Sequence, residues 1–367
     1  MEAHTQADTV QVERPALESF CRRIFEAHGL TEEDAAQAAK VLVAADARGI
    51  PSHGVARLQL YINGLESGLM QPDAPIEVVR ETAASIAVNA HGAMGAPVSI
   101  RTMRRVIKKA GTNGAAFGTV RDSNHFGIAG YYAMMALDAD MLGIAMTNTA
   151  ALAVPTFGRQ VMFGTNPIAF AAPADEEGAF VLDMATTVVP RGKIEVYDRA
   201  DRTLPEGWAV DKTGRSATDP AALLEDMSRR VGGGLLPLGG KGELFSGYKG
   251  YGLAVMVDIL CGVLSGGDFG PGLADTANST ARVGHFFGAI QIDRFRDPNE
   301  FRRDMDRMLR QLRNSPPAED AERVYFAGQK EFEQEAAAAQ RGISLAAQTY
   351  ERLVAIAEAH DVLPPPT

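Results

Sequence analysis

The chain has 367 residues, of which 46% are hydrophobic and 22% are charged. This length predicts two or three structural units, and the composition excludes a disordered protein or a small scaffold that lacks a core. The 36 basic and 46 acidic residues give a net charge of −10, which repels phosphate backbones. We therefore expect no nucleic-acid partner.

Cysteine use and hydropathy bear on metals and on location. Cys21 and Cys261 are the only cysteines, and each lies in an apolar helical pattern, so we expect neither a disulfide framework nor a metal site. The first residues are polar and lack the pattern of a secretory signal. The longest apolar run, residues 250–264, contains Asp258 and is too short to cross a bilayer. The sequence thus favours a cytoplasmic protein with no membrane partner.

The N-terminal region predicts a pair of helices. Apolar residues recur at helical spacing from Leu17 to His28, and Gly29 stands where a glycine often ends a helix. Thr31 is followed by three acidic residues, which is typical of a helix start, and an alanine-rich stretch then continues to Ala47.

The middle of the chain predicts an α/β body, and helical patterns return after it. Strands are expected at residues 85–90, 115–120, 142–147, 168–172, 180–183 and 286–292, with helices at 96–110, 128–139 and 250–264. Further helices are expected at 299–313, 329–341 and 344–360. We therefore expect an α+β fold of mixed layers, with an N-terminal helical region (1–75), a body (76–296) and C-terminal helices (297–367) that pack back on the first region.

The most informative segment is residues 51–65, PSHGVARLQLYINGL. Ser52 is a favoured N-cap residue, so the segment predicts a helix in which His53, Arg57 and Tyr61 share one face, apart from an apolar stripe. An arginine fork can hold a carboxylate while a histidine one turn away exchanges a proton with the neighbouring oxygen. The positive end of the helix dipole would favour neutral histidine. The alternative interpretation is a solvated helix face with a capping serine.

Two other residues stand where strands end. His125 follows the strand expected at 115–120, at a place where α/β folds present ligands to a cleft, although it also fits a packing role beside a capping Asn124. Asp183 ends an apolar strand and is able to orient a histidine, or alternatively to cap the following turn.

Phosphate-binding signatures are missing from the sequence. It contains neither Gly-x-Gly-x-x-Gly after a strand nor a Walker A motif, so a nucleotide would be held in a non-Rossmann manner. Lys249, which lies between glycines before a helix, is a weak candidate for a pyrophosphate contact, and a plain loop is the alternative.

Seven motifs together resemble the type 2 malate/L-lactate dehydrogenase family, which includes sulfolactate and ureidoglycolate dehydrogenases, diketogulonate reductase and cyclic imino-acid reductases. The motifs are ADARGIPSHGVARL (45–58), SNHFG (123–127), FGTNPIA (163–169), LDMAT (182–186), RGK (191–193), LPLGG (236–240) and GYKGYGL (247–253). The resemblance extends from about Leu17 to Leu353.

The resemblance implies a non-Rossmann oxidoreductase that transfers hydride between NAD or NADP and a small 2-hydroxy or 2-oxo acid. Malate or lactate is the first expectation for the substrate, and a cyclic imino acid is the alternative. It also implies a homodimer with sites near the subunit boundary, and a mixed sheet across which the cofactor extends.

Site roles follow from the same resemblance. His53 is expected as the proton donor or acceptor with Ser52 and Asp183 as relay partners, Arg57 and Tyr61 as carboxylate ligands, and His125 as an alternative acid/base. We rank His53 first because it alone shares a helix face with Arg57. The expected cofactor residues are Thr149, Thr165, Asn166, Val181, Leu182, Asp183, Met184, Ala185, Tyr248, Lys249, Gly328, Gln329 and Lys330.

Two further interpretations compete with a dehydrogenase. A hydrolase would use Ser52, His53 and Asp183 as a triad, but adjacent serine and histidine side chains usually point apart, and the sequence has no Gly-x-Ser-x-Gly elbow. A catalytically idle binding protein is disfavoured because the serine, histidine, arginine and aspartate positions are all filled.

Overall fold

A seven-stranded mixed sheet forms the centre of the computed structural model, which describes residues 9–274 and 281–367. In spatial order its strands are β2 (Glu77–Glu81), β3 (Ser85–Asn89), β4 (Ala115–Ser123), β10 (Val283–Gln291), β5 (Met141–Thr147), β6 (Ile168–Ala172) and β7 (Phe180–Met184). All neighbouring pairs are antiparallel except β3 and β4. That parallel pair is joined by a crossover helix, as parallel strands require.

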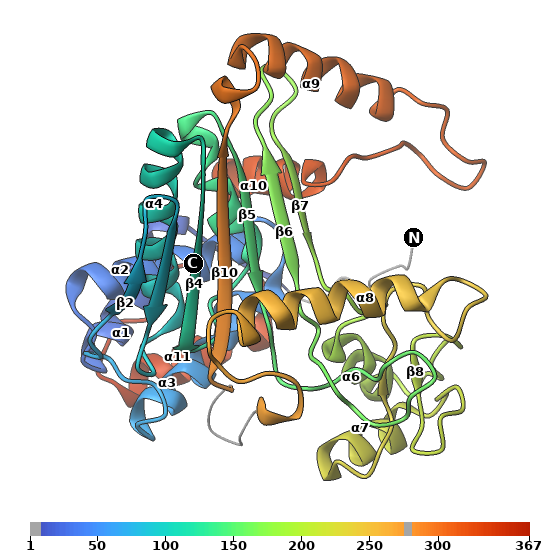
Figure 1. Cartoon of the computed structure of the whole chain (residues 1–367). Coiled ribbons are helices and arrows are strands. Elements are labelled where there is room, and N and C mark those ends of the chain that lie inside the picture. The colour runs from blue at the N-terminus through green and yellow to red at the C-terminus, as the bar shows by residue number, and fades with distance from the viewer. Residues whose placement is uncertain (1–8, 275–280) are drawn as a thin grey trace.

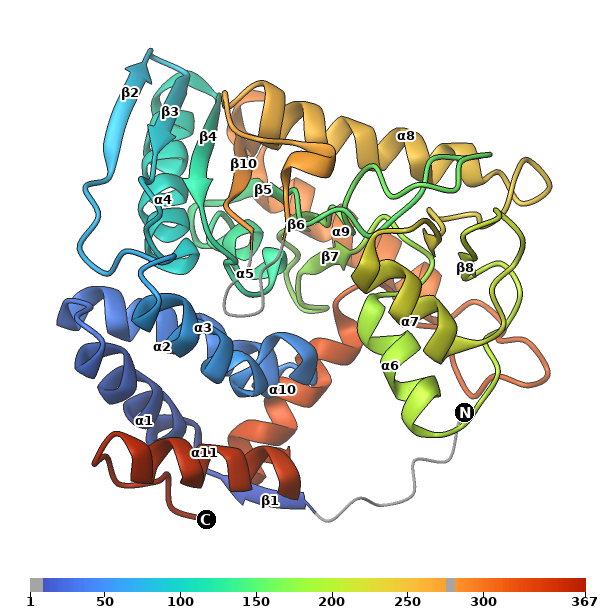
Figure 2. The same cartoon turned by 90° about the horizontal axis from the view of Figure 1, so that it is seen from below.

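Helices cover both faces of the sheet (Figures 1 and 2). α4 (Gly95–Asn113) and α5 (Ala129–Met134) lie on one face, where α5 contacts β5, β6 and β7. α8 (Gly247–Asp258) lies across the other face and continues into a π-helical turn, Ile259–Val263, that packs on β10. The central strands β10, β5 and β6 are accordingly apolar on both sides, and residues 283–289 of β10 are all buried.

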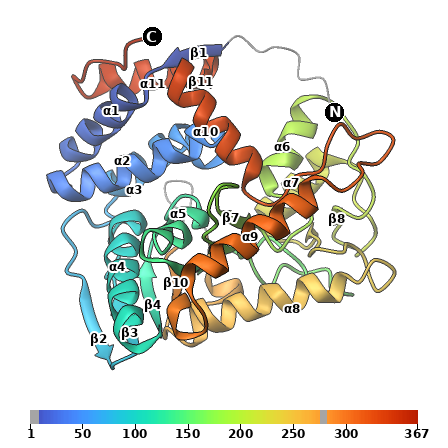
Figure 3. The same cartoon turned by 90° about the horizontal axis from the view of Figure 1, so that it is seen from above.

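The two ends of the chain meet in a third layer beyond α4 and α5 (Figure 3). It contains α1 (Arg14–Ala27), α2 (Glu32–Ala47), α3 (Leu58–Glu66), α10 (Gln329–Arg341) and α11 (Ala347–Ala359). Strand β1 (Thr9–Val12) pairs antiparallel with β11 (Ile343–Ala346), and α10 contacts α2. The expected start of α2 is confirmed, because the Thr31 hydroxyl accepts a hydrogen bond from the Asp34 N–H at 3.2 Å.

Two further groups extend from the sheet. A small lobe with its own apolar core contains α6 (Arg191–Arg199), β8 (Ala209–Val210), α7 (Pro220–Arg229) and β9 (Gly234–Leu235). Helix α9 (Pro298–Arg313) crosses the end of the sheet near the β6–β7 turn (Figure 1).

The mixed α+β fold class and the six expected strands are confirmed, whereas three helical predictions need correction. Residues 344–346 belong to β11, because they pair with β1, and the helix expected at 344–360 begins only at Ala347. The helix expected at 128–139 is interrupted after Met134 and resumes as a 3₁₀ turn, Leu137–Ala139. The helix expected at 250–264 is α-helical only to Asp258. The division at residues 75 and 296 stays a prediction.

Candidate active site

The segment that carries Ser52 and His53 is not one helix, and its prediction as such is wrong. It forms two 3₁₀ turns, Pro51–His53 and Val55–Arg57, before α3 begins at Leu58. Gly54 separates the turns with an extended backbone, at φ −91° and ψ −153°. His53 and Arg57 therefore do not lie one turn apart on a common helix, and the reason for ranking His53 first is lost.

The break at Gly54 is made by the carboxylate of Asp46 on α2. Its Oδ2 accepts a hydrogen bond from the Val55 N–H at 2.7 Å. A Cβ on Gly54 would lie 2.1 Å from both Asp46 oxygens, so only glycine fits there. Burial raises the pKa of Asp46 to about 7. The sequence reasoning missed Asp46 as a site residue, although an aspartate among the buried apolar residues of a helix was a usable signal.

His53 is held as a neutral imidazole. Its Nδ1 lies 2.9 Å from the Ser52 hydroxyl oxygen, so the adjacent serine and histidine side chains do not point apart. Burial and, second to it, the nearby Arg57 guanidinium lower the pKa of His53 to about 4. Histidine is thus unprotonated at neutral pH, as the sequence predicted, but burial is the main cause and not a helix dipole.

His125 stacks against His53, with ring centroids 5.6 Å apart and planes 27° apart. Its Nδ1 lies 2.6 Å from the Tyr61 hydroxyl oxygen and accepts a hydrogen bond from the Gly127 N–H at 3.3 Å. Because the Gly127 N–H can only donate, Nδ1 is the acceptor nitrogen and the proton of the neutral ring is on Nε2. Burial lowers the pKa of His125 well below its ordinary value, so this ring is also neutral.

Tyr61 and Arg57 are placed differently from each other. Tyr61 is buried at 4% exposure, and burial raises its pKa, so the hydroxyl keeps its proton and donates it to His125. The hydroxyl is thus engaged with His125 in this structure, and a role for Tyr61 as a carboxylate ligand stays a prediction. Arg57 is half-buried, and its Nε donates to the Ser52 carbonyl at 2.8 Å. Within the described chain the terminal nitrogens of Arg57 have no hydrogen bond and face no carboxylate, so they are available to a ligand.

A cavity of about 260 Å³ is lined by residues that neighbour the two histidines in the sequence, but not by His53 or His125 themselves. Its wall includes Ile50, just before the Ser52 turn, and Ile128, just after His125. The other lining residues are Arg48, Gly130, Val181, Leu182, Asp183, Tyr325, Phe326, Ala327, Gly328, Lys330 and Glu331. Five of the expected cofactor residues therefore share one cavity.

Asp183 lies in the wall of this cavity and not against His53. Its Oδ2 accepts a hydrogen bond from the Gly130 N–H at 2.7 Å, and among the described residues it makes no bond to His53. The relay from Asp183 to His53 that the resemblance implied is thus absent from this structure. Desolvation by the surrounding protein raises the pKa of Asp183 to about 6, and the hydrogen bond from Gly130 partly opposes that shift.

The cavity offers both charge types that a dinucleotide needs. Arg48 donates to Glu335 at 2.8 Å and lies over the Phe332 ring, while the Lys330 ammonium lies 4.3 Å from the centroid of Tyr325. These cations suit phosphate oxygens, and the Asp183 carboxylate suits sugar hydroxyls. The residues present therefore fit a nicotinamide dinucleotide.

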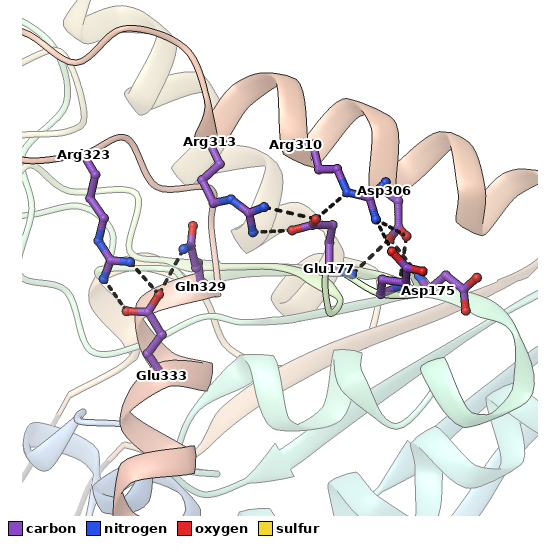
Figure 4. Close-up of polar contacts among 9 residues, drawn as sticks. Asp175, Glu177, Asp306, Arg310, Arg313, Arg323, Gln329 and Glu333 are labelled. Carbon is purple, nitrogen blue, oxygen red and sulfur yellow. Dashed lines mark hydrogen bonds and ion pairs between the residues drawn. The ribbon is translucent and has the colours of Figure 1, made fainter.

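A polar network holds the segment that brings residues 325–330 to the cavity (Figure 4). Arg310 and Arg313 on α9 both pair with Glu177 in the β6–β7 turn, the first at 2.6 Å. Farther along, Arg323 pairs with Glu333 at 2.6 Å, and Gln329 donates to the same carboxylate at 3.0 Å. The side chain of Gln329 is thus used within α10 and does not line the cavity.

The remaining cofactor candidates form a separate group beside α8. The Thr149 hydroxyl accepts from the Thr165 N–H at 2.9 Å, and Asn166 accepts from the Thr149 N–H at 3.2 Å. Met184 and Ala185 are half-buried and lead from the cavity toward this group. Tyr248 and Lys249 are exposed at the start of α8.

Comparison with known proteins decides the family. Residues 12–354 match the model of the malate/L-lactate dehydrogenase family. The chain belongs to that family. It is 43% identical over 323 residues to a malate dehydrogenase from Pyrococcus horikoshii, covering 88% of each chain. It is 39% identical to an L-sulfolactate dehydrogenase from Methanocaldococcus jannaschii, over 82% of this chain and 83% of that one. The crystal structure of an Entamoeba histolytica malate dehydrogenase superposes with a TM-score of 0.92 at 33% identity, covering 97% of this chain and 99% of that one.

Membership of this dehydrogenase family makes the chain an oxidoreductase and sets the hydrolase interpretation aside. The geometry agrees, because Ser52 and His53 are paired while Asp183 is bonded to Gly130. The cavity wall also includes residues that sequence reasoning did not single out, among them Arg48, Ile50, Gly130 and Tyr325. These residues come from three separate segments, 48–50, the chain at Gly130 and the chain at Tyr325, and only the fold shows that they meet.

Proposed function

We propose that the protein is an NAD- or NADP-dependent oxidoreductase that acts on a small 2-hydroxy or 2-oxo acid. The observation that carries this proposal is the pair of neutral, stacked histidines beside Arg57, whose terminal nitrogens bond to none of the described residues. Malate or lactate is the first candidate substrate, because relatives named malate dehydrogenase share 43% identity. A cyclic imino acid is the alternative, since a relative at 34% identity is named for pyrroline- and piperideine-carboxylate reduction.

Arg57, His125 and His53 each have a distinct task in this proposal. The Arg57 fork holds the substrate carboxylate through two hydrogen bonds. His125 presents an Nε2–H that donates to the substrate oxygen, because Nδ1 is used as an acceptor. His53 can place its own proton on Nδ1, toward Ser52, and so leave Nε2 as the base in the oxidising direction. This division of tasks replaces the helix-face argument as the reason for ranking His53 first.

The cavity lined by Arg48, Asp183 and Lys330 is the proposed cofactor site. Arg48 and Lys330 would contact phosphate oxygens, and Asp183 would contact a ribose hydroxyl. Thr149, Thr165, Asn166, Tyr248 and Lys249 remain proposed ligands of the far end of the dinucleotide. When bound, the nicotinamide supplies or accepts the hydride. The choice between NAD and NADP stays open to the assay below.

The test is a substrate panel with both reduced cofactors. Purified protein is mixed with NADH or NADPH and with oxaloacetate, pyruvate, sulfopyruvate or a cyclic imino acid, and loss of nicotinamide absorbance is followed. Turnover of one or more 2-oxo acids supports the proposal, and turnover of the imino acid alone selects the alternative substrate class. No oxidation with any pair, or ester hydrolysis without cofactor, refutes it.

We further propose a homodimer in which α8 contributes to the interface. Within the part of the chain that the structure describes, exposed apolar side chains lie along α8 and the π-helical turn that continues it. They include Ile259 at 51% and Leu264 at 60% exposure. A contiguous apolar face of this kind is typical of a protein interface. Light scattering that gives the mass of a single chain, or an Ile259→Glu variant with an unchanged oligomeric state, would count against this surface.

No helix in the described residues is long and apolar enough to cross a membrane, and a cytoplasmic location stays a prediction.

A further inference from the structure

Three helices end at one point on the layer formed by the two chain ends. His28 is the C-cap of α1, Glu66 is the last residue of α3, and His360 is the C-cap of α11. The His28 and His360 rings meet edge to face with centroids 4.6 Å apart, and His28 Nε2 lies 3.4 Å from Glu66 Oε1. Among residues 9–274 and 281–367, this is the only group of three His, Cys, Asp or Glu side chains with ligand atoms within 4.8 Å of one another.

The proton of His28 is fixed on the nitrogen that faces away from the group. Its Nδ1 lies 2.7 Å from the Ile24 carbonyl oxygen, which can only accept, so Nδ1 carries the hydrogen. Nε2, which lies 3.4 Å from Glu66 Oε1, is then the nitrogen that a metal ion would occupy in place of a proton. A histidine whose other N–H donates to a backbone carbonyl is the usual arrangement of a metal ligand.

The electrostatic setting also favours a cation. A helix C-terminus carries a partial negative charge, and three of them converge here together with the Glu66 carboxylate. The His28 side chain is only 8% exposed, while Glu66 is exposed, so an ion could enter from solvent and rest on a buried ligand. An ion pair between Glu66 and one histidine would explain the position of one ring, but it would not explain why two histidines meet here.

We propose that His28, Glu66 and His360 form a site for a divalent transition metal of the Zn²⁺ type. Two imidazole nitrogens and one carboxylate oxygen are a common zinc ligand set, with water in the fourth position. Bonds of about 2.0–2.1 Å in a tetrahedron place ligand atoms about 3.4 Å apart, which is the present His28–Glu66 separation. Rotation of the Glu66 and His360 side chains would bring the remaining ligand atoms, now within 4.8 Å of one another, to that spacing. The ion would fasten α11 to α1 and α3, a structural role apart from the proposed hydride transfer.

The test is zinc binding by the full chain without a polyhistidine tag. Isothermal titration should show one tight Zn²⁺ site per chain, with no binding of Mg²⁺ or Ca²⁺ at the same concentration. Glu66→Gln and His360→Gln should each weaken zinc affinity by at least the roughly 10–100-fold that loss of a supporting contact costs. The rise in melting temperature with zinc should disappear with them. Glu66 is exposed, so its variant is expected to fold normally.

His91→Gln is the matched control. His91 pairs with Glu77 at 2.8 Å and has the same two group types, but among the described residues no third ligand completes a group there. Its variant should bind zinc as the unmodified protein does. The proposal is refuted if the unmodified protein binds no zinc, or if Glu66→Gln and His360→Gln bind it unchanged. Loss of the site in His53→Ala but not in His360→Gln would likewise refute it, because it would place the ion at the catalytic histidines.

Discussion

The imidazoles of His53 and His125 stack with centroids 5.6 Å apart, although 72 residues separate them in the chain. Each ring has a different partner at Nδ1, the Ser52 hydroxyl for His53 and the Tyr61 hydroxyl for His125. Two neutral rings are thus presented side by side, one with a fixed Nε2–H and the other free to expose a lone pair. The proposed chemistry depends on this difference.

Arg57→Lys should weaken substrate binding far more than cofactor binding. Lysine keeps the charge but loses the planar fork, and losing a bidentate charged contact costs about 1.5–3 kcal/mol. We expect KM for the 2-oxo acid to rise by roughly 10–150-fold in steady-state assays. An equal loss of NAD(P)H affinity, measured by fluorescence titration, would contradict the substrate role of Arg57.

Tyr61→Phe should lower kcat by about 3–10-fold, the usual effect of losing one neutral hydrogen bond. Without the hydroxyl, the Gly127 N–H at 3.3 Å is the one remaining donor to His125 Nδ1 among the described residues, so the tautomer that carries Nε2–H is held less firmly. Tyr131→Phe is the control, because Tyr131 is a half-buried tyrosine of α5 that, within the described chain, contacts neither histidine. Equal activity of both variants would show that Tyr61 does not set the tautomer.

Gly54→Ala should disrupt the turn that presents His53. The added Cβ would meet both Asp46 oxygens at 2.1 Å, and overpacking of this kind costs about 1–3 kcal/mol of unfolding free energy. Activity should fall in parallel. Gly192→Ala is the control, because a Cβ there meets nothing within 4 Å. A normal melting temperature and normal kcat for Gly54→Ala would contradict the packing described here.

Asp46→Asn should change how stability depends on pH. Burial raises the pKa of Asp46 to about 7, so between about pH 4 and pH 7 the folded chain holds a proton that the unfolded chain has released. The free energy of unfolding therefore falls as pH rises through that window. Asparagine keeps an acceptor for Val55 but cannot ionise, so urea titrations across pH 4–8 should show a shallower fall. Parallel curves for both proteins would mean that Asp46 titrates normally.

The sequence predicted the sheet strands and the family, but it could not predict contacts made across the fold. The apolar runs of β4, β5, β6 and β10 are long enough to identify locally. By contrast, Tyr61 fits a helix-face pattern, and only the packing of α3 on the chain after β4 shows that its hydroxyl reaches His125. The break at Gly54 likewise comes from Asp46, eight residues earlier on another helix.

Short elements were the least predictable part of the fold. β1 has four residues and pairs with β11, which also has four residues and lies near the far end of the chain. Strands this short have too few residues to show a recognisable pattern in the sequence. The cavity has the same character, because Arg48 and Lys330 come from opposite ends of the sequence. A motif contains Arg48 and the family resemblance implied Lys330, but the meeting of the two segments depends on the docking of α10 against α2.

The most direct test is the turnover of His53→Ala, measured beside His125→Ala with the best substrate and cofactor pair. Loss of a positioned proton donor or acceptor typically costs about 10²–10⁴-fold in rate, so kcat of His53→Ala should fall by that range while NAD(P)H binding stays within a few-fold. His125→Ala should lose less. If His125→Ala is nearly inactive and His53→Ala keeps more than roughly a tenth of the activity, the two histidines have exchanged roles and the account is contradicted.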